Sequence, residues 1–336
     1  MPRDPRPSAR PRRRRLCAVL LALCVPLSGA AAPAPSTVER IQARGVVRCG
    51  SVERPGLAHA GADGRWSGLL VDICGAIATA LLGSPDRIAY AGYASEADFD
   101  RIRADRDDVA FLTGAEINAH GLAGVLLPGP NVYIARNAVM VPGAAREQHV
   151  AELAGGGICF LSGESAERSL EAWFDERRLA WLRHAYSEDG EMVDAYAAQR
   201  CHAIAGEATR LAAQAHYRGA EHLASRILPE ALNRFPVVAA TSTRDGRWAA
   251  IVAWTVNTLV NGARPDGKWY AGGAGAMPLA APELGLAGGW QARVLAASGS
   301  YCAIRARHLG AGGPCPQGGG AAGKAPDEEL LLPYVE

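Results

Sequence analysis

Short apolar runs alternate with amphipathic segments along the first third of the chain. Runs of strand length lie at 45–49, 87–93 and 108–112, and apolar positions at helical spacing lie at 69–82 and 96–103. Gly83-Ser84-Pro85 ends the longer of these two predicted helices. Strands and helices in alternation are typical of an α/β fold with mainly parallel sheets, and the sequence predicts this class.

The same alternation begins again in the second third of the chain. Residues 138–141 and 157–161 are apolar runs, and a helix is expected directly after the second run. Residues 237–240 form another apolar run, and 248–260 predicts an amphipathic helix that packs on the first part of the chain. The chain is therefore expected to enter a second α/β unit and then return to the first.

This restart predicts two lobes joined by a hinge with two crossings. Lobe one is expected at 33–137 and 237–310, lobe two at 138–236, and a flexible Gly- and Pro-rich tail at 311–336. The crossings are expected near 134–140 and 235–240, and a cleft between two hinged lobes is where a small ligand would bind. A single sheet running through both regions would contradict this division.

The first residues predict export. Arg12 to Arg15 close a basic segment, residues 16–25 are apolar, and Gly29 to Ala32 offers a small-residue cleavage site. Ten apolar residues are too few to cross the ~30 Å hydrocarbon core of a bilayer. We therefore interpret residues 1–32 as a cleaved signal peptide and expect a periplasmic protein. A membrane anchor is the alternative, and Arg13-Arg14 leaves export by the twin-arginine route open.

Removing that segment changes the charge of the chain. The whole sequence has 35 Lys and Arg residues against 34 Asp and Glu. Seven of the arginines and only Asp4 lie in residues 1–32, so 28 basic and 33 acidic residues remain, a net charge of −5. A mildly acidic chain lacks the basic patch with which proteins bind nucleic acid, and we expect no such partner.

Cysteines indicate disulfide bonds. Six remain after residue 32: Cys49, Cys74, Cys159, Cys201, Cys302 and Cys315. An even number in an exported chain favours disulfides, although six cysteines allow about 15 connectivities. Local order suggests Cys49–Cys74, Cys159–Cys201 and Cys302–Cys315. A free, buried Cys74 is the alternative for that residue. CxxC spacing is missing from the sequence, so we expect no metal site.

Several motifs together resemble one known family. They are Cys49-Gly50, Pro55-Gly56-Leu57, Asp63-Gly64-Arg65-Trp66-Ser67-Gly68, Val71-Asp72-Ile73-Cys74 and the spacing of Trp248, Ile251, Val252, Trp254, Thr255 and Leu259. In this order they resemble the periplasmic amino-acid-binding proteins of bacterial ABC importers, solute-binding protein family 3. The resemblance covers most of 38–310. It implies a type II two-lobe binding protein, monomeric and without a cofactor, that brings an amino acid or a related cationic or zwitterionic solute to an inner-membrane ABC permease.

Ligand contacts on lobe one are implied by the same resemblance. Leu57 stands where the family has an aromatic residue that covers the ligand. The family's Thr and Arg, which bind the ligand carboxylate, fall at Ile117 and His120. Because His lacks the permanent charge and paired donors of Arg, this departure weakens carboxylate binding. Thr113 and Asn118 are candidates to replace the lost hydrogen bonds. An exposed loop position is the alternative for His120.

Lobe two departs less from the family pattern. Gly163 and Ser165 suit a helix start that binds a carboxylate, whereas Glu164 would repel an anion unless it turns away to solvent. Glu207 falls on the family's ammonium-binding Asp, and its alternative is a stabilising place at the start of the next helix. With one cation lost and these acids present, the ligand is expected to be more cationic, or less anionic, than an ordinary amino acid.

Two other functions stay open. A sensor or accessory protein descended from the same fold would explain ligand positions that have drifted from the family pattern. An exported enzyme is the third reading, and Glu164 with Glu207 would be its acid pair. Gly272-Gly273-Ala274-Gly275 lacks the Lys-Ser/Thr of a phosphate loop, and no triad order supports catalysis, so we expect a protein that is not an enzyme.

Overall fold

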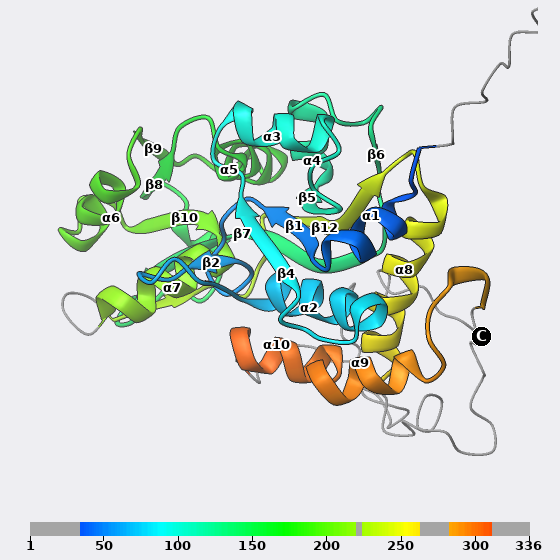
Figure 1. Cartoon of the computed structure of the whole chain (residues 1–336). Coiled ribbons are helices and arrows are strands. Elements are labelled where there is room, and N and C mark those ends of the chain that lie inside the picture. Colours follow the sequence, from blue (N-terminus) through cyan, green and yellow to red (C-terminus); the bar gives the residue numbers. More distant parts are fainter. Residues whose placement is uncertain (1–33, 220–223, 263–281, 311–336) are drawn as a thin grey trace, which may run out of the picture. The chain divides into compact units, whose positions relative to one another are not determined.

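The computed structural model describes residues 34–219, 224–262 and 282–310 (Figure 1). The predicted signal peptide at 1–32, the tail at 311–336 and the Gly-rich run at 272–275 lie outside these residues. The chain separates into two compact units, Met1–Pro35 and Ser36–Glu336. All the described helices and strands belong to the second unit.

The first group of strands is a parallel sheet with the order β4-β1-β5. Its members are β4 (Ile88–Gly92), β1 (Val47–Ser51) and β5 (Val109–Thr113), and both neighbouring pairs are parallel. Helix α2 (Leu69–Leu82) follows β1 through the hairpin β2 (His59–Ala60) and β3 (Trp66–Ser67), and α3 (Glu96–Arg103) connects β4 to β5. The two helices have the bounds that apolar spacing predicted, so the α/β expectation is confirmed here.

The second group of strands has the order β10-β8-β9. They are β10 (Ala203–Glu207), β8 (Gly157–Leu161) and β9 (Leu182–Tyr186), again parallel, with α5 (Ser165–Glu176), α6 (Asp189–Ala197) and α7 (Ala208–Gly219) between or after them. The 3-10 helix η1 (Val150–Leu153) precedes β8. Each strand again runs into a helix, which is the pattern of a parallel sheet with crossover helices.

Two long antiparallel strands join the groups. They are β7 (Asn131–Pro142) and β12 (Asn233–Ser242). The second part of β12 pairs with β5, and the second part of β7 pairs with β10 and with β11 (Ser225–Ile227). The hydrogen-bonded path is therefore continuous, β4-β1-β5-β12-β7-β10-β8-β9. The expectation that no single sheet runs through both regions is wrong, because the two crossing segments are themselves strands that pair with each other.

The buried side chains form separate cores on the two groups of strands, although the sheet itself is continuous. Two apolar clusters cover the faces of the first group of strands and take no buried member from 136–236. The two clusters around the second group take all their buried members from 138–228. Helices α8 (Gly246–Asn261), α9 (Trp290–Ser298) and α10 (Tyr301–Leu309) contribute to the first core, with η2 (Pro282–Leu284) beside them. Each group thus has its own core, as independently packed lobes require.

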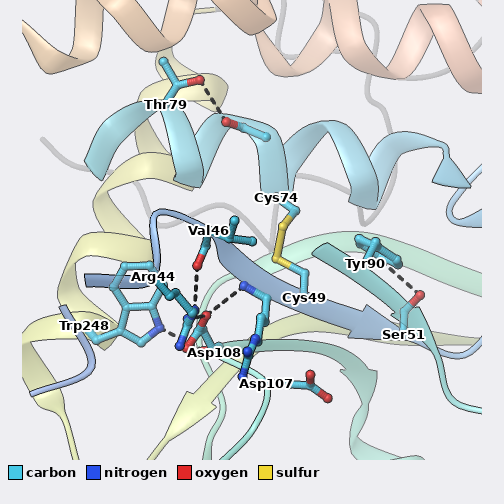
Figure 2. Close-up of a disulfide and its surroundings, with 12 residues drawn as sticks. Arg44, Val46, Cys49, Ser51, Cys74, Thr79, Tyr90, Asp107, Asp108 and Trp248 are labelled. Atoms are coloured by element: carbon cyan, nitrogen blue, oxygen red, sulfur yellow. Dashed lines mark hydrogen bonds and ion pairs between the residues drawn. A yellow bond between two sulfur atoms is a disulfide. The ribbon is translucent and has the colours of Figure 1, made fainter. Parts of the chain in front are cut away.

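Two disulfides brace the two groups separately. One joins Cys49 on β1 to Cys74 on α2 (Figure 2). The other joins Cys159 on β8 to Cys201, just before β10. Both are pairs that the order of the cysteines suggested. The third expected pair, Cys302–Cys315, includes a residue beyond the described part of the chain. Among the helices that the structure describes, none is long and apolar enough to cross a membrane.

Polar contacts fix helix α8 to the rest of the first core. The indole Nε1 of Trp248, on α8, donates to the carbonyl oxygen of Asp108 at 2.8 Å (Figure 2). Asp245 accepts from the backbone N–H of Trp248 at 2.9 Å and from that of Thr37 at 2.7 Å. It thereby caps α8 and holds the start of α1 (Thr37–Arg44), the first helix of the described chain.

Candidate functional site

The carboxyl ends of the two groups of parallel strands face each other. On the first side β5 ends at Thr113, which lies opposite Val237 on β12, and Val237 lies opposite Tyr133 on β7. On the second side β10 ends at Glu207, opposite Asn137 on β7. The two ends point toward each other across four residue steps of β7, roughly 13 Å of strand. Ligands of open α/β sheets bind outside the carboxyl ends of the strands, so this region is the candidate site.

The first edge carries a buried arginine. The Nη2 of Arg54 lies 2.5 Å from Oε1 of Glu116, and only 12% of the Arg54 side chain is exposed. Its Nη1 is buried and has no hydrogen-bond partner among the residues that the structure describes. The other Glu116 oxygen accepts from the N–H of Thr113 at 2.8 Å and from its hydroxyl at 3.0 Å. Glu116 is therefore fully engaged, while half of the Arg54 guanidinium tip is not.

A pair of hydroxyl groups lies within the electrostatic influence of this arginine. The Tyr90 hydroxyl donates to Oγ of Ser51 at 3.0 Å, on neighbouring strands of the sheet. Burial raises the pKa of Tyr90, and the hydrogen bond to Ser51 and the positive charge of Arg54 offset part of that rise. Tyr90 therefore stays protonated and remains a donor at neutral pH.

The predicted lobe-one contacts take different places. Leu57 is fully buried in the first core. Thr113 is buried and forms a capping box with Glu116 at the start of α4 (Gly114–Ala119). Asn118 is exposed on that helix. The structure thus brings Thr113 to Arg54 and Glu116, while Leu57 belongs to the apolar core.

His120 is bound to α3. Its ring stacks on Phe99 with centroids 3.6 Å apart, and its Nδ1 lies 2.7 Å from Oε2 of Glu96. Its carbonyl oxygen accepts from Arg103. The side chain is 27% exposed, so it is neither a free loop residue nor a member of the group around Arg54. His120, which stands where the family has Arg, therefore takes part in the packing of α3 against the end of α4.

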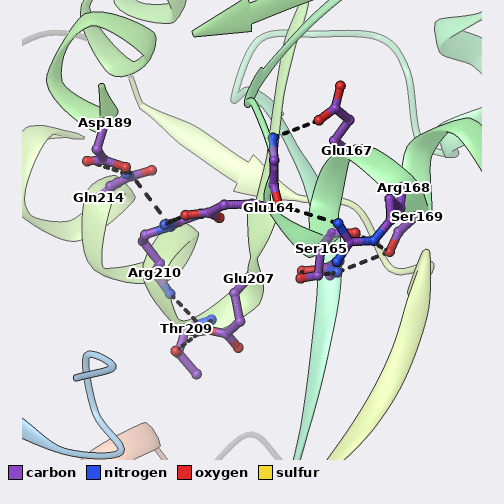
Figure 3. A network of polar contacts seen from close by, with 12 residues as sticks. Glu164, Ser165, Glu167, Arg168, Ser169, Asp189, Glu207, Thr209, Arg210 and Gln214 are labelled. Atoms are coloured by element: carbon purple, nitrogen blue, oxygen red, sulfur yellow. Dashed lines mark hydrogen bonds and ion pairs between the residues drawn. The ribbon is translucent and has the colours of Figure 1, made fainter. Parts of the chain in front are cut away.

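The second edge holds an ion-pair network around Arg210 (Figure 3). Glu164, the N-cap of α5, takes two hydrogen bonds from the Arg210 guanidinium, at 3.0 and 2.6 Å. Asp189 lies 4.0 Å from the Nε of the same arginine. Burial lowers the pKa of Arg210, but the hydrogen bond to Glu164 and the charges of Glu164, Asp189 and Glu207 raise it further than burial lowers it. Glu164 is therefore paired with a cation, while its side chain remains partly exposed to solvent.

One carboxylate oxygen of Glu207 accepts hydrogen bonds, and the other accepts none from the described residues. Its Oε2 accepts from the backbone N–H groups of Thr209 at 3.2 Å and Arg210 at 3.3 Å, and from the Thr209 hydroxyl (Figure 3). These bonds cap the first turn of α7, which was the alternative role for this acid. Its Oε1 is buried, and within the described part of the chain it has no hydrogen-bond partner. Capping and ligand binding are thus compatible at Glu207.

Gly163 and Ser165 are engaged within the protein. The N–H of Gly163, which has φ +80°, donates to Glu167 at 2.8 Å. The fully buried Asn137 of β7 donates through Nδ2 to the hydroxyls of Ser165 and Ser169, both at 3.1 Å. Asn137 thus anchors the start of α5 to the crossing strand.

Sequence reasoning missed Arg54, Arg210 and Asn137. Arg54 directly precedes the Pro55-Gly56-Leu57 motif, and Arg210 stands three residues after Glu207 on a helix start, a spacing that brings side chains together. From the sequence, only His120 was considered as a cation of this region, whereas the structure also places Arg54 and Arg210 at its two edges. Among the described residues, no group of three His, Cys, Asp or Glu side chains is placed to hold a metal ion.

No protein-family model matches the chain. It is 28% identical over 320 residues to the general L-amino acid-binding periplasmic protein AapJ of Rhizobium johnstonii, covering 89% of this chain and 92% of that one. It is 24% identical over 302 residues to the putative amino-acid ABC transporter-binding protein YhdW of Escherichia coli K12, covering 84% and 87%. It is 28% identical over 244 residues to the glutamate/glutamine/aspartate/asparagine-binding protein BztA of Rhodobacter capsulatus, covering 71% and 70%.

Solved structures show the fold. An ABC transporter periplasmic binding protein from Brucella ovis with glutathione bound superposes with a TM-score of 0.68 at 23% identity, covering 84% of this chain and 93% of that one. An ancestral cationic amino acid solute-binding protein gives a TM-score of 0.51 at 14% identity, covering 68% and 95%. The predicted two-lobe binding-protein fold is confirmed, and the curated relatives confirm the resemblance seen in the motifs.

Proposed function

We propose that this chain, a homologue of the periplasmic amino-acid-binding components of ABC transporters, is itself the substrate-binding component of an ABC importer. It binds an amino acid or a related small zwitterionic or cationic solute between its two lobes, as a monomer, and presents it to an inner-membrane permease. It acts by binding and not by catalysis. Residues 1–32 direct it to the periplasm and are removed there.

One observation carries this proposal. Two polar groups of side chains, built around Arg54 and Arg210, lie at strand ends that face each other across the crossing strands β7 and β12. Small ligands need few polar groups if these converge from two rigid elements. The proposed hinge lies in the crossing strands, with lobe one at 33–137 and 237–310 and lobe two at 138–236. The separate apolar cores on the two sides support this division.

On lobe two we propose Glu207 as the group that binds an ammonium. Its Oε1 is buried without a hydrogen-bond partner in the described chain, and an unpaired buried carboxylate oxygen is costly unless a cation approaches it. Gly163, Glu164 and Ser165 lie at the neighbouring helix start and complete this side of the site. Glu164 contributes through its pair with Arg210, which keeps the local charge close to balance.

A second function has one observation in its favour. Six of the eight predicted contact residues are already engaged within the protein, by burial in the apolar core or by polar contacts: Leu57, Thr113, His120, Gly163, Glu164 and Ser165. This favours a sensor or accessory protein that kept the fold but no longer transports a solute.

Ligand screening distinguishes these functions. Purified protein is heated with each of the L-amino acids, their amines and glutathione, the molecule bound in the Brucella ovis structure, and positive compounds are titrated calorimetrically. A ligand at about 100 times its Kd should stabilise the fold by roughly 2.7 kcal/mol. A specific, saturable stabilisation supports the importer component, and N-terminal sequencing of the exported protein should place its first residue near 33. If all these compounds leave the melting temperature unchanged, the accessory function is favoured instead.

A further inference from the structure

Arg54 sits in a loop whose backbone is firmly held. It follows the carboxyl end of β1, its carbonyl oxygen accepts from the N–H groups of Leu57 and Ala58 at 3.0 and 2.8 Å, and its own N–H donates to Ala58 at 2.8 Å. Gly68 has φ +130°, and a Cβ there would clash with the carbonyl of Leu57. Because the loop is fixed on both sides, the Arg54 side chain leaves it from a defined point. Such rigidity lowers the entropy lost when a ligand binds.

The guanidinium of Arg54 is half satisfied. Glu116 pairs with Nη2, but both Glu116 oxygens are already used, on Arg54 and on Thr113. Nη1 is buried, and the described residues offer it no hydrogen-bond partner. A buried N–H group of a cation that lacks an acceptor is costly, and a carboxylate is the acceptor that best fits the guanidinium edge.

Its neighbours favour an anionic partner. The hydroxyl groups of Ser51, Tyr90 and Thr113 lie at the same sheet edge, where they are hydrogen-bonded to one another or to Glu116. On the facing edge Arg210 is already paired with Glu164, so its charge is largely neutralised within lobe two. His120 is stacked on Phe99 and paired with Glu96 on α3. The Nε of Arg210 is also buried without a hydrogen-bond partner among the described residues, but Arg210 has two acids beside it, Glu164 and, 4.0 Å away, Asp189. Arg54 combines an unused donor with only one neighbouring acid.

We infer that Arg54 is the residue that binds the carboxylate of the ligand, and that the ligand of this chain therefore carries a free carboxylate. The inference rests on the proposed binding function and narrows its ligand class to α-amino acids and other zwitterions with a free acid group. It also reverses the expectation of a ligand more cationic, or less anionic, than an ordinary amino acid, which followed from the loss of the family's Arg at the position of His120. The zwitterion would place its acid on Arg54 and its ammonium on Glu207.

The test compares a free acid with its amide. The best amino-acid ligand from the screen and its carboxamide are titrated calorimetrically into the unmodified protein and into Arg54→Gln and Arg54→Lys. Arg54→Gln should weaken binding of the free acid by at least about tenfold, as expected for one charge-assisted hydrogen-bonded contact, and should change carboxamide binding much less. Arg54→Lys keeps the positive charge but loses the paired donors of the guanidinium, so its affinity for the free acid should lie between those of the unmodified protein and Arg54→Gln. Arg65→Gln is the matched control, because Arg65 is 88% exposed and pairs with Asp63.

A second variant should have the opposite effect on the affinity for the free acid. Glu116→Gln removes the negative charge next to Arg54 but keeps a side-chain oxygen that can accept from the N–H of Thr113 and so preserve the cap of α4. It should therefore tighten binding of the free acid. Melting temperatures identify variants that fail to fold, and circular dichroism checks α4. If His120→Gln or Arg210→Gln weakens the free acid selectively while Arg54→Gln does not, this inference is overturned and the binding function stands. If the unmodified protein binds only amines or carboxamides, the inference about the carboxylate is likewise overturned, while the proposed binding function stands. If it binds none of the compounds, the proposed function and the inference fail together.

Discussion

Glu164 and Arg210 form a two-point ion pair, with Oε1 3.0 Å from Nη1 and Oε2 2.6 Å from Nη2. The acid is the N-cap of α5 and the base lies in the first turn of α7, so the pair links two helix starts at the edge of the second group of strands. An acid at a helix start is favourable by itself, and here a cation on the neighbouring helix balances it. The charge of the site therefore cannot be read from Glu164 alone.

Arg210→Gln should destabilise lobe two. It leaves Glu164 without its cation, and the side chains are 26% and 41% exposed. The loss should therefore lie between that of a surface pair and that of a buried one, about 1–2 kcal/mol of unfolding free energy. Urea denaturation measures it, and Arg65→Gln, which breaks an exposed pair, should cost less. A double-mutant cycle with Glu164→Gln should show coupling between the two residues. Additive effects would mean that the pair contributes no stability of its own.

Removing either disulfide should lower stability more than breaking any single ion pair. The bonds close stretches with sequence separations of 25 for Cys49–Cys74 and 42 for Cys159–Cys201. On the chain-entropy model these loops correspond to about 3.5 and about 3.9 kcal/mol, so the two double Cys→Ala variants should rank in that order. Urea denaturation with and without reductant gives both values. If reductant leaves the unmodified protein as stable as before, the bridges do not carry this stability.

Asp245 gives a pH dependence with a definite sign. Burial raises its pKa, but hydrogen bonds from the N–H groups of Trp248 and Thr37 outweigh burial, and the pKa lies below its ordinary value. A lowered folded-state pKa means that its stabilisation is complete above the unfolded value of about 3.9 and is lost as the pH falls through the lowered value. Asp245→Asn should thus cost about 1 kcal/mol at pH 7 and flatten the stability profile below pH ~4. The exposed Asp86→Asn is the control, and equal profiles for both variants would contradict the assignment.

Local elements were predictable because their signals are local. The bounds of α2 and α3 follow from apolar spacing and from the breaker after Leu82, and the strands β1, β4 and β5 follow from short apolar runs. The continuity of the sheet was not predictable. It depends on pairing between β7 and β12, whose partners lie about a hundred residues apart in sequence, and no local pattern sets that register.

Site geometry was predictable only in part, for the same reason. Glu207 was a candidate because a motif marks its position, but its two oxygens differ in their contacts only through the fold of the first turn of α7. Arg54 meets Glu116 across 62 positions of sequence, and Glu164 meets Arg210 across 46. Leu57 was expected at the ligand, yet its apolar side chain is fully buried in the first core. Sequence motifs named residues at both edges of the candidate site but not the direction in which their side chains point.

Glu207→Gln tests the ammonium side of the site. The amide keeps an oxygen that can accept from the N–H groups of Thr209 and Arg210, so the cap of α7 should survive, but the negative charge is lost. If Glu207 binds the ammonium, affinity for an amino acid should fall about tenfold or more, because a charge-assisted hydrogen bond is replaced by a neutral one.

The deaminated analogue of the same amino acid provides the control ligand for this variant. It has no ammonium, so its affinity should stay the same or rise when the charge of Glu207 is removed. Calorimetric titration of both ligands into both proteins gives the four values needed. Unfolding free energy should change little, because the lost interaction with the start of α7 is worth only about 0.3–1 kcal/mol and one buried oxygen has no partner in the described chain to lose. An equal loss for both ligands would instead assign Glu207 a purely structural role.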